Sequence, residues 1–249
     1  MSIIRKAVRT AQNHFPSLAE AKNDFYHFTR SHLGSVHDKE FAVLAHLPRR
    51  PDDLFLDIGA NRGQSILAIR RFRPAASIVS FEPNPLIFAR LQRRFGHLPS
   101  VTLHPFGLGS APGRFPLFVP SYGRFTYDGC ASFSAEAARG YFSAETLFFF
   151  DATQVSLRQY DCEVRTLDSL DLSPRFIKID VEGFEHEVLL GGRDTLRRCR
   201  PALLLERGQD RPALDGLLAE HGYREVAWRD GRFVPERRDG LNRLLLALS

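Results

Sequence analysis

Short apolar runs alternate with segments of helical spacing from about residue 51 onward. Runs without polar alternation are typical of strands buried on both faces of a parallel sheet. The segments between them carry apolar residues three to four positions apart, as in Ile66, Ile69 and Phe72. The alternation predicts an α/β fold with a doubly wound, mostly parallel sheet. Strands are expected at 54–58, 77–81, 101–104, 176–180, 202–206 and 244–247, and helices through Phe72, at 86–95, around Val188, Leu189 and Leu196, and at 214–221.

The first 50 residues have a different pattern. Apolar residues from Phe15 to Phe28 recur on one helix face, and Phe41, Leu44 and Leu47 indicate a second short helix. We therefore expect an N-terminal helical extension over residues 1–50 and a main domain over residues 51–249. The histidines of the extension do not share a helix face, so no metal site is expected there.

Residues 110–165 interrupt the alternation of strands and helices. Segments 115–119 and 162–165 are expected to pair as antiparallel strands, and the chain between them is rich in glycine, serine and aromatic residues. A long insertion in a compact domain often forms a lid or a binding loop. We expect the consecutive phenylalanines Phe148, Phe149 and Phe150 to lie in a core.

Composition narrows the class of protein. The 249 residues are 43% hydrophobic and 25% charged, as in ordinary globular proteins. No run approaches the roughly 18 apolar residues of a membrane span, and the N-terminus lacks the pattern of a secretory signal. The three cysteines have no C-x-x-C spacing, which argues against a disulfide framework or a zinc site. A cytoplasmic protein without a transmembrane segment is expected.

The net charge of +5 invites a nucleic-acid interpretation, because lysine and arginine neutralise phosphates. The basic residues are, however, mostly interleaved with acidic ones, and dense runs such as Arg70-Arg71 are short. Charges arranged in this way usually lie on solvated helix faces. We therefore expect no nucleic-acid partner.

Four polar clusters follow predicted strands, at the edge of an open α/β sheet where ligands bind. The first contains Asp57, Gly59, Asn61, Gly63 and Ser65. Its glycines let a ligand approach the turn and the free N–H groups of the next helix. It departs from G-x-G-x-x-G, and its carboxylate suits a ligand with an amino group and a positive sulfur, such as S-adenosylmethionine. The alternative is a strand–turn–helix that binds nothing.

The second and third clusters extend this expected site. Glu82, Pro83 and Asn84 follow the second strand, with Glu82 placed 25 residues after Asp57. That is near the spacing of about 20 residues at which an acidic side chain meets ribose hydroxyls. After the third strand, Gly107 and Leu108 belong to a segment where an adenine ring could lie against apolar side chains.

The fourth cluster supplies two carboxylates, Asp180 and Glu182. Either could be the general base that deprotonates a hydroxyl nucleophile. The pair could also hold a divalent cation such as magnesium, although nothing else in the sequence supports a metal. For Glu182 and Glu185 the alternative is that they complement the dipole of the following helix.

Together these segments resemble the FkbM family of methyltransferases. The resemblance rests on 55–63 (FLDIGANRG), 81–84 (FEPN), 166–170 (TLDSL) and 177–185 (IKIDVEGFE), and it covers roughly residues 55–206. It implies a Rossmann-like class I methyltransferase fold over residues 51–249, with S-adenosylmethionine as methyl donor and a sugar or polyketide hydroxyl as acceptor. Asp57, Gly59, Asn61 and Gly63 would then shape the methionine end of the cofactor site, and Glu82 would hold the ribose.

By the same likeness, Asp180 and Glu182 would face the methyl group and the acceptor. The segment 129–132, in which Cys130 is a mild departure, resembles the stretch before the family's substrate region, so the insertion at 110–165 is expected to contribute to the acceptor site. We predict an O-methyltransferase acting on a small molecule or glycan, and leave open a homo-oligomer. The alternatives are an RNA methyltransferase on the same fold, a catalytically silent binding module and, least favoured, a dehydrogenase.

Overall fold

The computed structural model describes Lys6, Ala7, Thr10, Asn13 and residues 39–206, 212–235 and 242–247. Most of the predicted helical extension lies outside these residues. The second helix expected there is a 3-10 helix, η1 (Lys39–His46). Phe41 and Leu44 are buried, and the buried Arg73 donates from Nε to the Leu44 carbonyl at 2.6 Å. These contacts fix η1 against the main domain.

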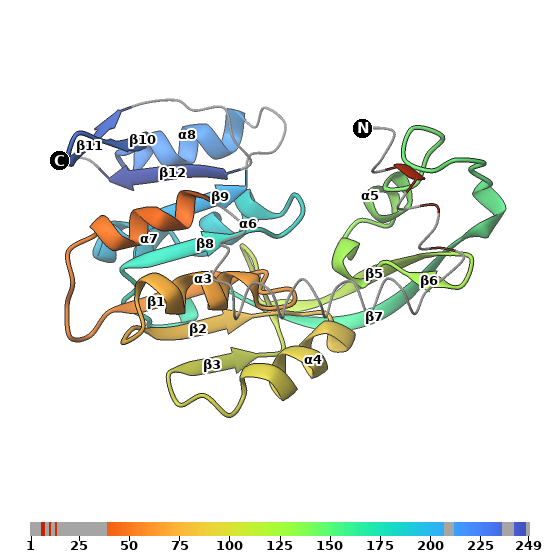
Figure 1. Cartoon of the computed structure of the whole chain (residues 1–249), viewed down its shortest axis with the longest axis horizontal. Coiled ribbons are helices and arrows are strands. Elements are labelled where there is room, and N and C mark those ends of the chain that lie inside the picture. Colours follow the sequence, from red (N-terminus) through yellow and green to blue (C-terminus); the bar gives the residue numbers. More distant parts are fainter. Residues whose placement is uncertain are drawn as a thin grey trace.

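The predicted doubly wound sheet is present and is mostly parallel, which confirms the expected α/β class (Figure 1). In the described part of the chain its strand order is β11-β10-β12-β9-β8-β1-β2-β3. Neighbouring strands from β3 to β9 pair in parallel, whereas β12 lies antiparallel between β9 and β10. The predicted strands are β1 (Leu54–Ile58), β2 (Ser77–Phe81), β3 (Val101–His104), β8 (Phe176–Ile179), β9 (Ala202–Glu206) and β12 (Asn242–Ala247).

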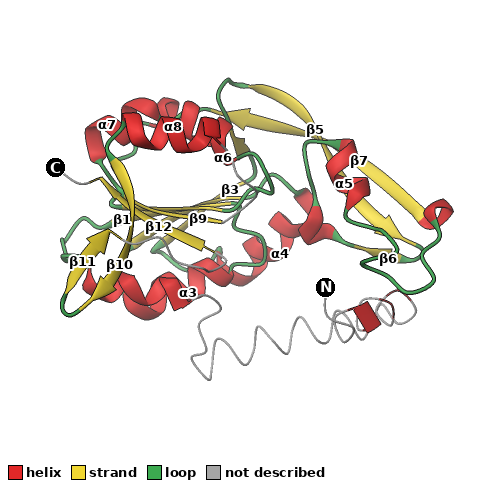
Figure 2. Cartoon of the chain, turned by 90° about the horizontal axis from the view of Figure 1, so that it is seen from above, coloured by secondary structure: helices red, strands yellow, loops and turns green. Residues whose placement is uncertain are grey.

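Helices cover both faces of this sheet (Figure 2). Successive strand residues point to opposite faces, so Phe55, Phe176 and Leu204 pack with η1 and two helices in one core. Leu56, Ile177 and Leu203 belong to the other core. The helices of the first core are α3 (Gln64–Phe72) and α4 (Pro85–Phe95), and those of the second are α6 (Glu185–Leu190), α7 (Arg193–Cys199) and α8 (Pro212–Glu220).

The helix expected around Val188 and Leu196 is in fact two helices, because the chain breaks at Gly191 and Gly192. A Cβ on Gly191 would lie 2.0 Å from the carbonyl oxygen of Gly109, so a side chain cannot be accommodated there. Asp168 lies outside α7 but caps its first turn. Its carboxylate accepts hydrogen bonds from the backbone N–H of Thr195 at 2.8 Å and of Asp194 at 3.1 Å.

The hairpin of β10 (Tyr223–Arg229) and β11 (Arg232–Pro235) was not predicted. Its turn is made by Asp230 and Gly231, both with positive φ, as two-residue hairpin loops require. Asp-Gly is a strong turn signal, but the flanking residues do not form an apolar run.

The insertion folds as a second sheet that extends from the side of the larger one (Figure 1). Two long strands, β5 and β7, pair antiparallel from Gly113↔Val164 to Tyr122↔Val155, which confirms the predicted pairing. The elements of the insertion are β4 (Gly107–Leu108), β5 (Gly113–Tyr122), β6 (Phe125–Thr126), η2 (Asp128–Cys130), α5 (Ala135–Gly140), η3 (Ala152–Gln154) and β7 (Val155–Arg165), and the 3-10 helix η4 (Asp168–Leu170) follows.

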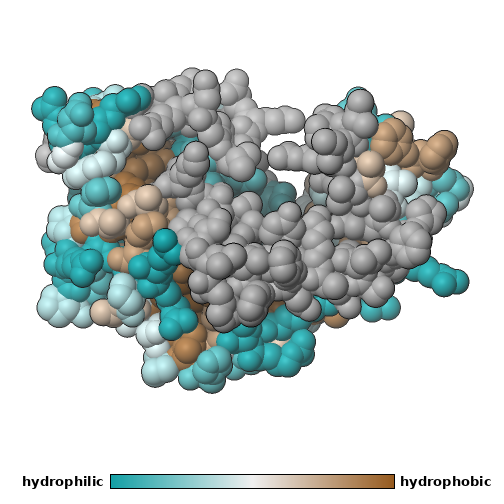
Figure 3. Space-filling model, in the orientation of Figure 1, coloured by the Kyte–Doolittle hydropathy of each residue, from teal (hydrophilic) through white to brown (hydrophobic). Residues whose placement is uncertain are grey.

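This second sheet has a small core of its own, formed by Tyr122, Tyr127, Phe142 and Leu147. The prediction that Phe148–Phe150 are core residues is wrong for Phe149, which is 96% exposed. Phe148 and Phe150 are half-buried. A space-filling view shows a patch of hydrophobic residues on the surface at the outer end of the second sheet (Figure 3).

Described residues of the N-terminal segment contact this second sheet. Asn13 Oδ1 accepts from the Tyr127 hydroxyl at 2.6 Å, and Thr10 Oγ1 accepts from the Phe148 backbone N–H at 3.0 Å. These contacts connect the start of the chain with the insertion.

Candidate active site

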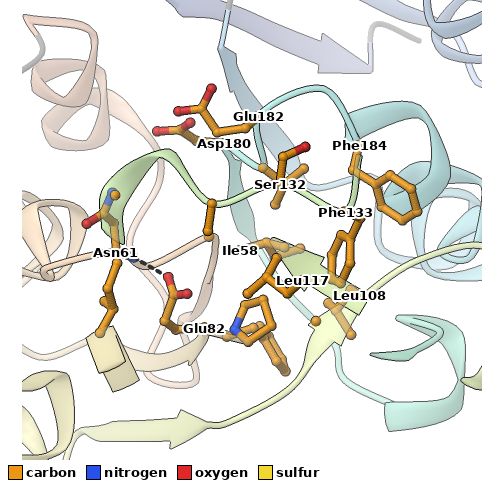
Figure 4. A pocket seen from close by; sticks show the side chains of 18 of the residues that line it. Ile58, Asn61, Glu82, Leu108, Leu117, Ser132, Phe133, Asp180, Glu182 and Phe184 are labelled. Carbon is orange, nitrogen blue, oxygen red and sulfur yellow. Dashed lines mark hydrogen bonds between the residues drawn. The ribbon is translucent and has the colours of Figure 1, made fainter. Parts of the chain in front are cut away.

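A cleft opens at the carboxyl ends of β1, β2 and β8, where the second sheet meets the larger one (Figure 4). All four polar clusters predicted from the sequence contribute to it. The predicted residues that line the cleft are Gly59, Asn61, Glu82, Pro83, Gly107, Leu108, Asp180 and Glu182. The fold therefore brings together residues from positions 59 to 182 of the chain.

Glu82 is held at the cleft by two backbone donors. The N–H of Asn61 donates to Glu82 Oε2 at 2.8 Å, and the N–H of Asn84 donates to Oε1 at 2.9 Å. Burial raises the pKa of Glu82 to about 7, although both hydrogen bonds act in the opposite direction. Each carboxylate oxygen has a further lone pair, so Glu82 can accept from a pair of ligand hydroxyls.

The turn after β1 requires glycine at position 59. Its φ is +80°, and a Cβ there would lie 1.9 Å from the carbonyl oxygen of Asp180. The N–H of Asp180 donates to the Ile58 carbonyl at 3.0 Å, so the ends of β1 and β8 are tied together. Gly59 itself lines the cleft, so the backbone of this turn is accessible from it.

Asp57 and Ser65 lie beneath the cleft rather than on its surface. Asp57 is fully buried, its Oδ2 lies 3.5 Å from Ser80 Oγ, and burial raises its pKa. Ser65 also hydrogen-bonds to Asp57. Lys178 Nζ lies 3.8 Å from Asp57 Oδ1, an oxygen with no hydrogen-bond partner among the described residues.

Gly63 and Asn84 are also placed outside the lining. Gly63 has φ +83°, and a Cβ there would meet the Phe95 ring at 2.2 Å, so it permits α3 and α4 to pack. The Asn84 side chain caps α4 by accepting from the Leu86 N–H and donates to the Asp128 carbonyl at 2.9 Å. Both residues support the shape of the cleft from behind.

Three carboxyl groups gather on one side of the cleft: Asp180, Glu182 and Glu206. Figure 4 shows Asp180 and Glu182 side by side. Lys178 Nζ lies 3.1 Å from Asp180 Oδ2 and donates to the Gly59 carbonyl at 3.3 Å. Glu182 has φ +50°, an uncommon conformation for a residue other than glycine.

The pKa values of two of these groups are raised. Burial, followed by the charge of Asp180, raises the pKa of Glu182. Burial and the charges of Asp180 and Glu182 raise the pKa of Glu206 to about 8, and a side-chain hydrogen bond joins Glu206 to Asp180. The raised pKa favours the protonated form of Glu206, which can donate that hydrogen bond to Asp180.

Sequence reasoning did not identify Glu206 as a site residue. It ends β9, the strand next to β8, and the two strands pair in parallel. Parallel neighbours end at the same sheet edge, so an acidic residue at that position was the available signal.

The second sheet closes the cleft from the opposite side. Asp128, Gly129, Ser132 and Phe133 line the cleft, so the insertion contributes part of its wall. That this wall belongs to the acceptor site stays a prediction. The rings of Phe133 and Phe184 lie 5.3 Å apart between their centroids. Phe133 and Phe184 form an aromatic wall across from the turn after β1 (Figure 4). Neither was predicted as a site residue from the sequence.

The described part of the chain contains neither a cluster of metal-ligating side chains nor a membrane-spanning helix. No group of three or more His, Cys, Asp or Glu residues there is arranged to hold a metal ion. No helix among these residues is both long enough and apolar enough to cross a bilayer.

Comparison with known proteins gives consistent matches. A family model described as a methyltransferase FkbM domain matches residues 57–225. The 2-O-methyltransferase NoeI of Sinorhizobium fredii is 31% identical over 192 residues, which cover 74% of this chain and 74% of that protein. Methyltransferase sdnD of Sordaria araneosa is 28% identical over 203 residues, covering 72% of this chain and 76% of that protein.

A solved structure of a methyltransferase FkbM from Methylobacillus flagellatus aligns with a TM-score of 0.49 and 21% identity over 83% of this chain. The chain spans 47% of the length of that protein.

Proposed function

The chain belongs to the FkbM family of methyltransferases, and from that premise we propose that it transfers a methyl group from S-adenosylmethionine to a hydroxyl group of a sugar, glycan or natural product. The observation that carries the proposal is the arrangement of Glu82 on one side of a single cleft and of Asp180 and Glu182 on the other. The first suits a ribose, and the other two suit an acceptor that must lose a proton.

The cleft fits S-adenosylmethionine in its chemistry. Glu82 has lone pairs left for two hydroxyls, and Pro83 and Leu108 offer an apolar surface for an adenine ring. The buried Asn61 Oδ1 has no hydrogen-bond partner among the described residues, so it is a ready acceptor for a ligand N–H or O–H. Gly59 leaves its turn open to the methionine end. When bound, S-adenosylmethionine supplies a methyl group on a positively charged sulfur.

The chain's own task is then to align the acceptor and to remove its proton. Glu182 is the better base of the two predicted catalytic residues, because burial raises its pKa and so makes its carboxylate a stronger proton acceptor. Asp180 is tied to Lys178 at 3.1 Å and to Glu206. Asp180 therefore orients the acceptor hydroxyl, and the transferred proton rests on Glu182.

An oxygen acceptor is supported by the relative NoeI, which is named as a 2-O-methyltransferase. The aromatic wall of Phe133 and Phe184 supports an acceptor with an apolar face, such as a sugar ring. The predictions of a cytoplasmic location and of a possible homo-oligomer stay predictions.

The first test is thermal unfolding of the full chain with S-adenosylmethionine, S-adenosylhomocysteine or NAD, or without ligand. At about 100 times the dissociation constant a ligand adds roughly 2.7 kcal/mol of stability. For a domain of this size the midpoint should rise by about 5–10 °C with both sulfur nucleosides. No shift with either at saturation would favour the silent binding module, and a shift with NAD alone would favour a dehydrogenase.

The second test identifies the acceptor. The chain is incubated with S-adenosylmethionine labelled on its methyl group and with a panel of sugars, glycans, natural products and RNA. Label in a sugar or natural product, stable to the acid that cleaves methyl esters, supports O-methylation. Label in RNA alone would replace the proposal with the nucleic-acid alternative.

A further inference from the structure

A second groove lies beside the cleft, between α4 and the β5–β6 hairpin, and its walls carry four arginines: Arg62, Arg90, Arg93 and Arg124. We call it the arginine groove. Asp128 is the only acidic residue in its lining within the described part of the chain. Asp128 also lines the cleft, so the two cavities share a wall.

The described residues that line the arginine groove carry more positive than negative charge. Asp128 Oδ1 lies 2.5 Å from Arg62 and its Oδ2 lies 2.8 Å from Arg90, so a single carboxylate faces two guanidinium groups. Arg93 and Arg124 are exposed, and neither has an acidic partner among the residues that the structure describes. Among the described residues of the lining, four arginines and one aspartate give an excess of positive charge.

We propose that the arginine groove binds a phosphate or diphosphate group of a small-molecule ligand. Guanidinium groups match phosphate oxygens with paired N–H donors, which makes arginine the preferred residue for such groups. The buried carboxylate of Asp128 holds the Arg62 side chain, which is only 20% exposed, so part of the site is ordered before a ligand arrives. The arginines converge on one concavity, whereas an RNA strand needs a basic track along the surface.

The groove is coupled to the cleft through a short set of contacts. Asn84 donates to the Asp128 carbonyl at 2.9 Å, and Arg62 directly follows Asn61, whose N–H binds Glu82. A ligand with its phosphate among the arginines therefore lies next to the cleft. We identify this ligand with the methyl acceptor, and that identification rests on the proposed function. The binding of a phosphate group to the arginine groove does not depend on the proposed function.

The test is isothermal titration of the full chain with pyrophosphate. The double variant Arg93→Gln/Arg124→Gln removes two charges without leaving a buried acid unpaired, and it should weaken pyrophosphate binding at least about tenfold. The control is Arg224→Gln, an exposed arginine on β10, which should bind like the unmodified chain. S-adenosylmethionine binding is measured in parallel and should be the same in all three proteins, so failure of the groove and failure of the cofactor site are distinguishable.

Two results would overturn the proposal. One is the absence of pyrophosphate binding at millimolar concentration, and the other is equal binding by the double variant. A short single-stranded RNA that binds with a salt dependence of more than about four phosphates, and that the double variant Arg93→Gln/Arg124→Gln no longer binds, would assign the groove to nucleic acid instead.

Two further ligands distinguish the source of the diphosphate. Binding of uridine diphosphate glucose more tightly than pyrophosphate supports a nucleotide-linked ligand. Tighter binding of farnesyl diphosphate supports a lipid-linked one.

Discussion

The backbone N–H of Asn61 donates to Glu82 Oε2 at 2.8 Å, which fastens the turn after β1 to the end of β2. This bond orders the carboxylate that we assign to the ribose. Because burial raises the pKa of Glu82 to about 7, the carboxylate is only partly ionised near neutral pH.

S-adenosylmethionine should therefore bind more tightly as the pH rises through about 7, because the ionised form of Glu82 accepts more hydrogen bonds and ligand hydroxyls favour that form. Glu82→Gln should weaken binding roughly 10- to 100-fold and remove this pH dependence, in line with the loss of one charged hydrogen bond. Titration calorimetry between pH 6 and 8 measures both effects. Glu136→Gln, an exposed change on α5, serves as the control, and a pH-independent affinity of the unmodified chain would contradict the assignment.

Gly59→Ala should abolish cofactor binding and lower the stability of the fold. The substitution places a Cβ 1.9 Å from the Asp180 carbonyl oxygen at a φ of +80°. A cost of more than about 2 kcal/mol in the free energy of unfolding is expected. Gly216→Ala is the matched control, because Gly216 is exposed inside α8 with no atom within 4 Å of the added Cβ. That variant should gain roughly 0.5–1 kcal/mol in urea unfolding; equal behaviour of the two variants would be evidence against the close approach.

Glu182→Gln and Asp180→Asn should keep S-adenosylmethionine binding and lose turnover, with Glu182→Gln lowering kcat by about 10²-fold or more. In the unmodified chain the rate should rise with pH as Glu182, whose pKa is raised by burial, loses its proton. Methyl transfer to the acceptor found in the panel is measured across pH. Glu187→Gln on α6 is the control. Turnover of Asp180→Asn at the rate of the unmodified chain would remove Asp180 from the mechanism.

The raised pKa of Glu206 has a consequence for stability. The folded state holds its proton up to about pH 8, whereas the unfolded chain releases it near the ordinary value of 4.5. The unfolded state therefore binds fewer protons in this window, and stability should fall as the pH rises from about 4.5 to 8. Glu206→Gln keeps a donor to Asp180 and should flatten that fall in melting temperature. Glu220→Gln, an exposed change on α8, should not.

The second sheet should depend on its own core. Phe142 is 5% exposed, so Phe142→Ala should cost about 3–5 kcal/mol in the free energy of unfolding. Phe149→Ala removes a side chain that is 96% exposed and should change stability by less than about 0.5 kcal/mol. Urea unfolding followed by tyrosine fluorescence distinguishes the two. A similar loss from both variants would indicate that Phe149 is buried in solution.

The strands of the larger sheet could be predicted because burial on both faces produces a nearly continuous apolar run, as at Leu54–Ile58, where only Asp57 is polar. Helical spacing continues from Val188 to Leu196, but the adjacent Gly191 and Gly192 were a local signal for a break. What the sequence does not show is why glycine is needed there: the carbonyl of Gly109, 82 residues away in the chain, excludes a side chain at Gly191.

The candidate site, like the sheet, could be predicted only where a local sequence pattern marks it. Polar residues after strands mark the correct sheet edge, which is why Gly59, Glu82 and Asp180 lie together. Asp57 was expected at the cleft but lies beneath it, because it is still part of β1 and is fully buried between the neighbouring strands. Residues contributed by the insertion, such as Phe133, depend on how the second sheet docks.

The two ends of the insertion leave the larger sheet side by side. Gly107 and Leu108 pair with Val164 and Arg165, and the N–H of Gly109 donates to the Arg165 carbonyl at 2.9 Å. A segment anchored in this way can be lengthened, shortened or exchanged without moving either attachment point. On the proposed function, acceptor preference can therefore diverge through the insertion alone, while the strands proposed to hold the methyl donor keep their sequence. This junction is a natural site for grafting the insertion of one relative onto the scaffold of another.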